Sequence, residues 1–255
     1  MTQARGDVGI IGAGRFGAYY AGQLERAGYR VHRADVTDAA DVRALNVARA
    51  CASPIVIYAV PIRSLERAIL ETRDVLAPEA VVMDVSSVKI IPCAWLERHL
   101  PGRRVVGTHP LFGPQSAPVS CAGQRIAVCA IGADEDAAAQ VERMANALEL
   151  IVVRCTPAEH DTQVARTQFL THFIGRGTVR AGIARLALST RTHEALMDIV
   201  DVVCHDSIEL FEDMAAYNPK VPEVRAEFLA ALQAIDAQLA RREREVSRVV
   251  DTIQE

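Results

Sequence analysis

One imidazole stands directly before a rigid turn in the stretch HPLFGP, residues His109–Pro114. A proline after a histidine biases the histidine backbone toward an extended form, which would aim the imidazole out of a strand end. A histidine titrates near neutral pH and can therefore act as a general base. Taken alone, however, a histidine in a turn more often has a structural role than a catalytic one. The case for His109 as a base therefore depends on the other motifs of the chain.

A glycine-rich turn near the start of the chain predicts a dinucleotide site. The pattern GxGxxG follows a strand-like run and opens a helical one, as the dinucleotide fingerprint requires. The first glycine would allow the tight turn, the second a close approach to a pyrophosphate, and the third close packing of helix on strand. The six predicted cofactor-binding positions are Gly12, Ala13, Gly14, Arg15, Phe16 and Gly17.

The end of the second predicted strand points to the choice of dinucleotide. Asp35 follows Gly17 by 18 residues, and a carboxylate there accepts hydrogen bonds from ribose hydroxyls and repels a 2′-phosphate. This favours NAD over NADP, although Arg33 could instead hold that phosphate. Val60 and Pro61 end another strand and are predicted to line the cofactor site, because ligands bind at the carboxyl ends of such strands.

Two polar turns follow consecutive later strands. The first reads MDVSSVK and contains Ser87, and the second reads GTHPLFGP and contains His109. Turns at the carboxyl ends of neighbouring strands open into the same crevice, which would bring both residues beside the cofactor. Ser87 could also simply cap a helix that begins near Val88.

These motifs together resemble the prephenate dehydrogenase family, the NAD(P)-dependent enzymes of tyrosine biosynthesis that include arogenate dehydrogenases and 4-amino-4-deoxyprephenate dehydrogenases. The likeness spans about residues 8 to 175 and rests on the glycine fingerprint, the AVP strand end, the D-x-x-S-V-K and HP-x-F-G turns, and His160-Asp161 with His172 twelve residues later. It implies that His109 accepts the proton of the substrate ring hydroxyl. Ser87 would join that hydrogen-bond network, and His172 would lie near the substrate side chain.

The resemblance implies NAD-dependent oxidative decarboxylation of prephenate or a close analogue. Hydride would leave ring C4 while C1 loses carbon dioxide, so that the ring becomes aromatic, and the protein must align the substrate and supply a base. Alternatives stay open for two segments. His160-Asp161 could be only an N-terminal cap and charge of its helix and is kept out of the catalytic set, and His172 could be a core histidine beside Phe169 and Phe173.

The chain departs from the family at one position. Where the family carries an arginine that pairs with a substrate carboxylate, spacing from Asp206 places Asp201. Arg176, four residues after His172 and on the same helical face, is the candidate replacement, and Gln168 completes the predicted substrate-binding set. A carboxylate at Asp201 would suit a cationic substrate such as arogenate or 4-amino-4-deoxyprephenate, so we expect it to tune substrate choice.

The surrounding pattern predicts an α/β fold: an N-terminal Rossmann-type dinucleotide-binding domain over residues 1–156, then an all-helical substrate and dimerisation domain over residues 157–255. Apolar runs predict parallel strands, and longer periodic runs predict helices. The expected strands cover residues 8–11, 30–33, 55–60, 80–83, 104–107, 125–129 and 150–153, and the expected helices residues 16–27, 64–76, 134–148, 160–187, 192–217 and 221–253.

Composition narrows the classes of partner. The 255 residues carry a net charge of −4, which gives no basic patch for nucleic acid, and no run of 18 apolar residues predicts a membrane span. We expect a cytoplasmic protein with no extension beyond the two domains. The six cysteines show no metal-ligand spacing, and a homodimer through the helical domain is expected from its apolar stripes.

Two other functions remain open. A β-hydroxyacid dehydrogenase would need a lysine in the second domain, but the only lysine after Pro157 is Lys220, beside two prolines. A regulatory protein that binds NAD without chemistry would have no reason to bring His109 and Ser87 together.

Overall fold

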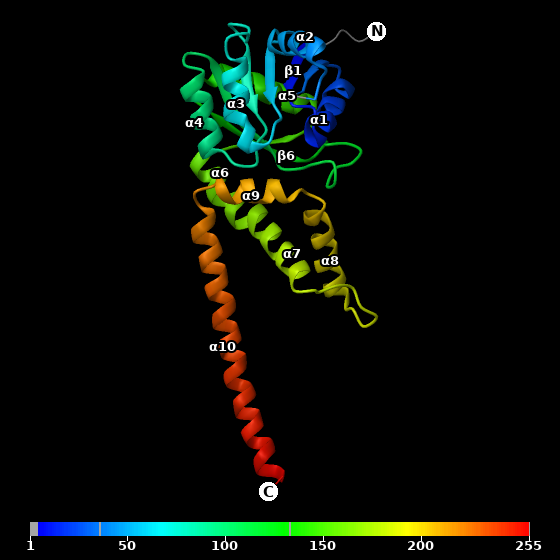
Figure 1. Cartoon of the computed structure of the whole chain (residues 1–255), viewed down its shortest axis with the longest axis vertical. Helices are drawn as coiled ribbons and strands as arrows, with labels where there is room; N and C mark the ends of the chain where they lie inside the picture. The colour runs from blue at the N-terminus through cyan, green and yellow to red at the C-terminus, as the bar shows by residue number, and fades with distance from the viewer. Residues whose placement is uncertain (1–4, 36, 133, 255) are drawn as a thin grey trace.

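The computed structural model of the chain describes residues 5–35, 37–132 and 134–254. The outer limits of the two predicted domains, residues 1 and 255, lie outside these ranges. A sheet with helices on both faces forms one end of the molecule, and a helical region packs beneath it and sends helix α10 far outward (Figure 1).

The sheet has seven strands in the described residues, in the order β2-β1-β3-β4-β5-β6-β7. All seven predicted strands are confirmed, with ends shifted by a few residues. The chain winds from β1 to one side and then to the other, and the crevice where the order reverses is the usual ligand site of such sheets. The strands are β1 Asp7–Ile11, β2 Arg30–Ala34, β3 Ile55–Tyr58, β4 Val81–Asp84, β5 Arg104–Pro110, β6 Arg125–Ala130 and β7 Ile151–Arg154.

The expectation of an all-parallel sheet is wrong at one pair. β5 and β6 are antiparallel, and His109 pairs with Ala127 inside this ladder. The connection over residues 111–124 holds no helix, so it cannot make the crossover that parallel strands need. The predicted turn HPLFGP therefore starts later than expected, because its first two residues still belong to β5.

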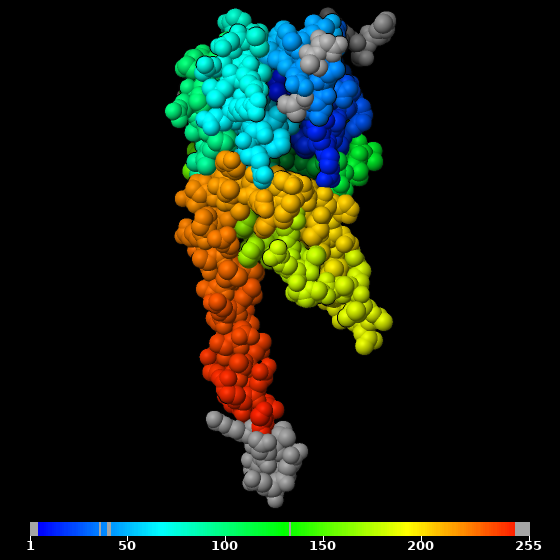
Figure 2. All heavy atoms as spheres, viewed as in Figure 1, coloured from blue at the N-terminus to red at the C-terminus, as the bar shows by residue number. Residues whose placement is uncertain are grey.

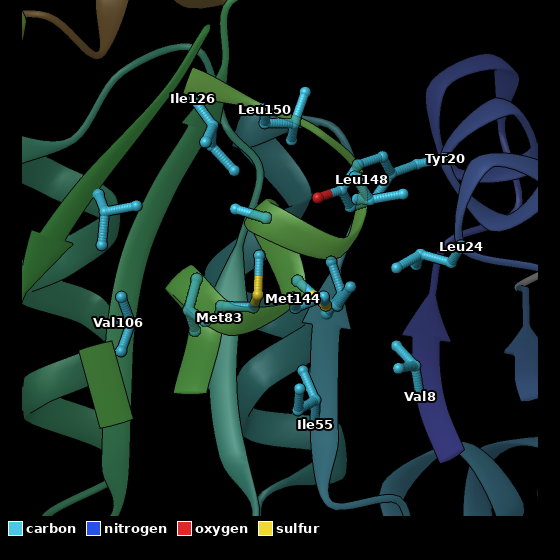
Figure 3. Packing of buried hydrophobic residues seen from close by; sticks show 14 of the residues in the cluster. Val8, Tyr20, Leu24, Ile55, Met83, Val106, Ile126, Met144, Leu148 and Leu150 are labelled. Atoms are coloured by element: carbon cyan, nitrogen blue, oxygen red, sulfur yellow. The ribbon is translucent and has the colours of Figure 1, made fainter. Parts of the chain in front are cut away.

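Both faces of the central strands β1, β3, β4, β5 and β6 are buried, as their nearly continuous apolar sequences predict, whereas the edge strands β2 and β7 are partly exposed. Neighbouring residues such as Val82 and Met83 enter different cores, one packed by α3 and α4 and the other by α1 and α5. Figure 3 shows the second core, where Met83 and Met144 meet between sheet and helix. The helices of this region are α1 Arg15–Arg26, α2 Ala40–Cys51, α3 Ile62–Thr72, α4 Ile90–His99 and α5 Glu135–Ala147. Of these, α2 was not predicted, and α4 was expected only as a helix that begins near Val88.

Only helices follow β7 in the described residues, which confirms the predicted order of an α/β sheet followed by a helical region. The proposed division between residues 156 and 157 would fall between β7 and α6, and it stays a prediction. The elements are α6 Pro157–Val164, the π-helical turn η1 Ala165–Phe169, α7 Leu170–Arg180, α8 Arg191–Cys204, α9 Ile208–Ala216 and α10 Val221–Gln254.

Two of the three long predicted helices are interrupted. The one expected over 160–187 ends at Arg180, because Gly182 adopts φ 71° and lets its own amide and that of Ile183 return to carbonyls of the last turn. The one expected over 192–217 breaks after Cys204, where the Ser207 side chain accepts from Leu210 N and starts α9. The helix expected over 221–253 is confirmed.

Polar contacts join the helical region to the carboxyl edge of the sheet. Arg63, on α3, binds Asp213 of α9 with Nε 2.8 Å from Oδ1, and the Asp213 side chain is 5% exposed. Arg15 donates to the backbone oxygen of His205 at 2.9 Å. Trp95 of α4 packs edge-on against Tyr217. These contacts hold the helices under the edge where β1, β3, β4 and β5 end.

Candidate active site

His109 lies at the end of β5, 2% exposed, and its ring meets a second histidine. Its Nδ1 is 2.9 Å from Nε2 of His160, and the two rings are edge-on with centroids 5.1 Å apart. His160 is in the first turns of α6, whose start is set by a reciprocal capping box between Thr156 and Glu159. The sheet and the helical region thus each contribute one imidazole.

The second imidazole is held by a buried carboxylate. Nδ1 of His160 is 2.8 Å from Oδ1 of Asp161, which is fully buried. The same carboxylate accepts the backbone N–H of Lys89 at 2.7 Å and of Ile90 at 2.9 Å, the first amides of α4. Asn218 donates to the backbone oxygen of Asp161 at 2.9 Å. Asp161 therefore caps a helix of the sheet region from across the junction.

The hydrogen bonds assign the protons of both rings. A carboxylate is acceptor-only, so His160 must carry its proton on Nδ1 and present a lone pair at Nε2. His109 must then donate its Nδ1 proton to that lone pair, which leaves Nε2 of His109 unprotonated. Nε2 of His109 makes no hydrogen bond within the described part of the chain. A basic nitrogen is therefore oriented by a chain of two contacts that ends at Asp161.

Burial keeps both rings neutral. It lowers the pKa of His109 well below 6.5, and electrostatic interactions with the neighbouring His160 ring and with the Lys89 ammonium lower it further. Burial also lowers the pKa of His160, although the hydrogen bond to Asp161 opposes the shift. A neutral imidazole at physiological pH is the form that can accept a proton.

The reading of His160-Asp161 as a local cap and charge is wrong. Thr156 caps α6, while Asp161 caps α4 and His160 contacts His109. The sequence offered one sign, a histidine directly followed by an aspartate, but the partner of His160 lies 51 residues away. Sequence spacing alone does not specify a contact of that range.

A buried ion pair supports the strand ends beneath this site. Lys89, fully buried, pairs with Asp84 at the end of β4 and donates to the backbone oxygen of Thr108 at 2.5 Å. Asp84 also accepts from the Ser86 amide at 3.0 Å and the Thr108 amide at 3.3 Å. Because both members of the pair bind the backbone of Thr108, the pair ties the end of β4 to β5 directly before His109. Removing one member would leave an uncompensated buried charge.

Ser87 lies in the loop between β4 and α4 and is half-buried. Helix α4 begins at Ile90, and its first amides bind Asp161, so the alternative in which Ser87 caps this helix is wrong. Within the described residues its hydroxyl makes no hydrogen bond to His109. Its predicted place in the catalytic network stays a prediction.

The glycine turn has the geometry that a dinucleotide needs. A Cβ on Gly12, at φ 105°, would lie 2.5 Å from the Ala59 oxygen, and one on Gly17 would lie 2.0 Å from the Gly12 oxygen. A Cβ on Gly14 would meet nothing within 4 Å, so the backbone there is open to a ligand. Gly14 is the N-cap of α1 and offers no side chain to its first amides. These amides are available to a phosphate.

Asp35 is tied to the same turn. Its Oδ2 accepts the Ala13 amide at 2.6 Å, and its Oδ1 accepts the backbone and hydroxyl of Thr37 at 2.9 and 2.8 Å. Burial would raise the pKa of Asp35, but the hydrogen bonds from Thr37 and Ala13 outweigh it and lower the pKa. Asp35 is thus an oriented anion beside the turn. Arg33 is exposed on β2.

The other predicted cofactor residues lie around the turn. Val60 is half-buried just beyond β3, its Cγ1 2.9 Å from the position of a Gly12 Cβ, and Pro61 is exposed at the N-cap of α3. Phe16 stacks on Tyr20 and contacts Phe112 of the loop after β5. The glycine turn and the HPLFGP loop therefore lie at the same edge of the sheet.

The helical region presents a row of buried polar atoms without partners. Gln168, His172 and Arg176 are spaced by four residues. Three of their atoms have no hydrogen-bond partner among the described residues: Oε1 of Gln168, Nδ1 of His172 and Nε of Arg176. Gln168 lies in the π-helical turn, a feature common at functional sites. A row of orphaned polar atoms on one helical face is costly unless a ligand satisfies it.

Two members of this row, Arg176 and His172, have other contacts that position them. Arg176 lies over the Phe211 ring at 5.1 Å, and its Nη2 donates to carbonyl oxygens at the end of α8 and beyond, 2.7 Å in the case of Asp206. His172 is 5% exposed, and burial lowers its pKa. Its Nε2 lies 3.6 Å from Oδ2 of Asp206. We call Gln168, His172 and Arg176 the polar row.

Asp201 does not join the polar row. Its carboxylate is 56% exposed and binds Arg185 at 2.7 Å, while Val200 and Val203 are the neighbouring α8 residues that are buried. The acidic side chain beside His172 is Asp206, five residues later and beyond the end of α8. The effect of Asp201 on substrate choice, which was inferred from the missing family arginine, stays a prediction.

Two kinds of feature are absent from the residues that the structure describes. No group of three or more histidine, cysteine, aspartate or glutamate side chains there is placed to hold a metal ion. No helix in the same ranges has the length and apolar character to cross a membrane.

Comparisons with known proteins place the chain in one family. The family model described as prephenate dehydrogenase, nucleotide-binding domain, matches residues 24–156, and the model described as TYRAAT1-like, C-terminal domain, matches residues 179–250. Arogenate dehydrogenase 2, chloroplastic, of Arabidopsis thaliana is 28% identical over 260 residues, which cover 91% of this chain and 69% of that protein. The 4-amino-4-deoxyprephenate dehydrogenase of Streptomyces pristinaespiralis is 28% identical over 236 residues, covering 85% and 78%.

A solved structure has the same fold. Prephenate dehydrogenase from Aquifex aeolicus, in complex with hydroxyphenyl propionate and NAD+, superposes with a TM-score of 0.74. The two chains are 20% identical, and the match covers 100% of this chain and 98% of that one.

The buried histidines predict a pH-dependent stability. Because the native pKa of His109 is depressed, its contribution to stability is present above the unfolded value of 6.5 and is lost as pH falls below it. Urea unfolding should therefore give a free energy of unfolding that decreases between about pH 7 and pH 5. His109→Gln should flatten this decrease, whereas the exposed His205→Gln should not. An equal slope in all three proteins would contradict the buried neutral ring.

Proposed function

We propose, from the premise that this chain belongs to the prephenate dehydrogenase family, that it catalyses NAD-dependent oxidative decarboxylation of prephenate or a close analogue. Hydride leaves ring C4, the carboxylate at C1 leaves as carbon dioxide, and the ring becomes aromatic. The observation that carries this proposal is the contact between His109 and His160, which leaves one basic nitrogen free at the carboxyl edge of the sheet.

His109 is the base in this proposal. Its Nε2 accepts the proton of the C4 hydroxyl as hydride departs, and the Nδ1 proton stays hydrogen-bonded to His160. The positive charge that develops on His109 is stabilised through His160 by the Asp161 carboxylate. His160 and Asp161 act as positioning residues, because they select the tautomer without touching the substrate. This division of roles resembles that of other histidine bases held by a carboxylate.

The residues of the glycine turn fit NAD. Gly14 leaves room for the pyrophosphate at the start of α1, and Asp35 is oriented to accept from the ribose hydroxyls. NAD, when bound, supplies the nicotinamide that takes up the hydride. Val60 and Pro61, just beyond the end of β3, are proposed to border that ring. The negative charge of Asp35 disfavours a 2′-phosphate, so NAD is preferred to NADP.

The polar row is proposed to bind the substrate side chain and carboxylates. Arg176 supplies a cation, and His172 and Gln168 supply polar atoms that have no other partner among the described residues. Because the row lies on the helical region and His109 on the sheet, a ring held between them would meet the base and the polar row from different sides. Ser87 is proposed to hydrogen-bond the same ring hydroxyl from the loop after β4.

A second candidate substrate has one specific observation in its favour. Asp206 places a carboxylate 3.6 Å from His172, and its side chain is 34% exposed. An anion there would attract the ammonium of arogenate or the amine of 4-amino-4-deoxyprephenate and would oppose an additional carboxylate. Relatives with those two activities are among the similar proteins.

We also infer a homodimer through the helical region. Helix α10 diverges from the α7–α8 pair and leaves an open space between them (Figure 2). Its outer part carries exposed apolar side chains at intervals of three, four or seven residues, the pattern of a helix that packs on another helix. These residues are Leu229, Leu232, Ile235, Leu239 and Val246. A second copy of the chain offers a matching stripe.

Variants of the positioning residues test the role of His109. His109→Gln should remove most turnover, and His160→Gln should lower kcat by about 100-fold, because the tautomer of His109 is no longer selected. NADH formation with prephenate should show a wild-type acidic limb of kcat/KM below pH 6.5, since burial depresses the pKa of His109. In His160→Gln this limb should move, while KM for NAD should not. Full turnover in His109→Gln would exclude the proposed base, and no turnover with any substrate would favour a regulatory protein.

A substrate panel tests the choice of ring. Prephenate, arogenate and 4-amino-4-deoxyprephenate would be compared at saturating NAD, with NADP as a control. Asp206→Asn should lower kcat/KM for the two amine-bearing substrates relative to prephenate by about 10-fold, the value of one charge-assisted hydrogen bond. Asp198→Asn, which loses an exposed contact with Arg185, is the matched control. An unchanged ratio in Asp206→Asn would remove Asp206 from substrate selection.

A further inference from the structure

Two cysteine side chains meet beside the active site without being part of it. Cys129 is in β6, and Cys155 directly follows β7. The parallel register pairs Val128 with Arg154, so these cysteines occupy the next opposite positions. Their sulfur atoms are 3.8 Å apart. Adjacent strands run about 4.8 Å apart, within the Cα separations that a disulfide spans.

The two thiols differ in access and in acidity. Cys129 is fully buried, whereas Cys155 is half-buried. Cys155 also borders a surface cavity of about 310 Å³, together with Arg154, Thr156, Pro157 and Glu159. The hydrogen bond from Cys129 lowers the pKa of Cys155, and the nearby Lys89 ammonium acts in the same direction. Donating that bond, with burial, raises the pKa of Cys129.

We propose that Cys155 and Cys129 are a reversible thiol–disulfide pair that exchanges with a low-molecular-weight disulfide such as glutathione disulfide. Cys155 is the thiol that the small molecule reaches first, and Cys129 is the thiol that resolves the mixed disulfide. Among the described residues neither thiol is hydrogen-bonded to His109 or to the polar row, so the pair is a modification site separate from the proposed chemistry.

The exchange balances in two steps. The Cys155 thiolate attacks one sulfur of glutathione disulfide, the S–S bond of glutathione breaks, and one glutathione thiolate leaves with a proton from solvent. The Cys129 thiol then loses its proton and attacks Sγ of Cys155, which forms the Cys129–Cys155 bond and expels the second glutathione. Two cysteine thiols are oxidised by two electrons, and one glutathione disulfide is reduced to two glutathione thiols.

A third cysteine, Cys93, lies near Cys129 and must be compared with Cys155 as the thiol that reacts first. Cys93, on α4, is buried opposite Gly107, where a Cβ would lie 2.3 Å from its Sγ. Gly107 pairs with Cys129 in the β5–β6 ladder, so Cys93 is a possible competitor for Cys129. Burial raises the pKa of Cys93 to about 12, and it does not border the cavity. Cys155 is therefore the first thiol to react.

The bond would act on the start of α6. Cys155 precedes Thr156, the N-cap of the helix that carries His160. Closing the sulfurs from 3.8 Å to about 2.0 Å would draw this cap toward β6, which pairs with β5 at His109. We expect the contact between His109 and His160 to loosen, with a several-fold lower kcat. This consequence rests on the proposed function, whereas formation of the bond does not.

Thiol counting on the full chain tests the pair. Cys204→Ser would serve as the background, because Cys204 is exposed and would react on its own. After incubation with glutathione disulfide at about pH 8, denatured protein should lose two of its five remaining thiols and retain no glutathione. Peptide mass mapping should identify the Cys129–Cys155 link, and dithiothreitol should restore both thiols and kcat.

Variants in the same background separate the two roles. Cys129→Ala should stop at glutathione bound to Cys155, and Cys155→Ala should lose no thiols under the same conditions. Five intact thiols in the background protein, a link through Cys93, or equal reactivity of Cys155→Ala would overturn the pair. Unchanged kcat in the bridged protein would overturn the effect on His160, and an inactive reduced protein would instead count against the proposed function.

Discussion

The carboxylate of Asp161 binds two parts of the molecule that lie far apart in the sequence. It accepts hydrogen bonds from the backbone N–H groups of Lys89 and Ile90 at the start of α4, and from Nδ1–H of His160 on its own helix. The first two bonds fix the helical region against the sheet. The third determines which nitrogen of His160 carries a proton, and hence which nitrogen of His109 is basic. One buried anion thus couples the packing of the junction to the chemistry at its edge.

The same junction explains why the proposed site is shared between both regions. The sheet ends with an oriented turn for a dinucleotide and with His109, whereas the helices contribute His160 and the polar row. Contacts such as Arg63 with Asp213 hold these two sets together at the carboxyl edge. Burial at this edge keeps His109 neutral. Beneath it, the buried ion pair of Lys89 and Asp84 is hydrogen-bonded to the Thr108 backbone.

Patterns local in the sequence predicted much of this structure. Continuous apolar runs such as Ile55–Tyr58 predicted the strands, and the glycine turn has the close contacts expected of Gly12 and Gly17. Long-range contacts were the ones missed. The His109–His160 pair joins residues from a strand and a helix, and no local pattern encodes it. Spacing along the sequence singled out Asp201, whereas the carboxylate that lies beside His172 is that of Asp206, just beyond the end of α8 at Cys204.

The tautomers of the two rings test the central claim most directly. Nitrogen-15 chemical shifts of histidine-labelled protein at about pH 7.5, assigned with His109→Gln and His160→Gln, report which ring nitrogens carry protons. The account predicts protonated Nδ1 and unprotonated Nε2 on both His109 and His160, and loss of this pattern at His109 in Asp161→Asn. A proton on Nε2 of His109 in the wild-type protein would contradict it, since that nitrogen could then accept none from a substrate.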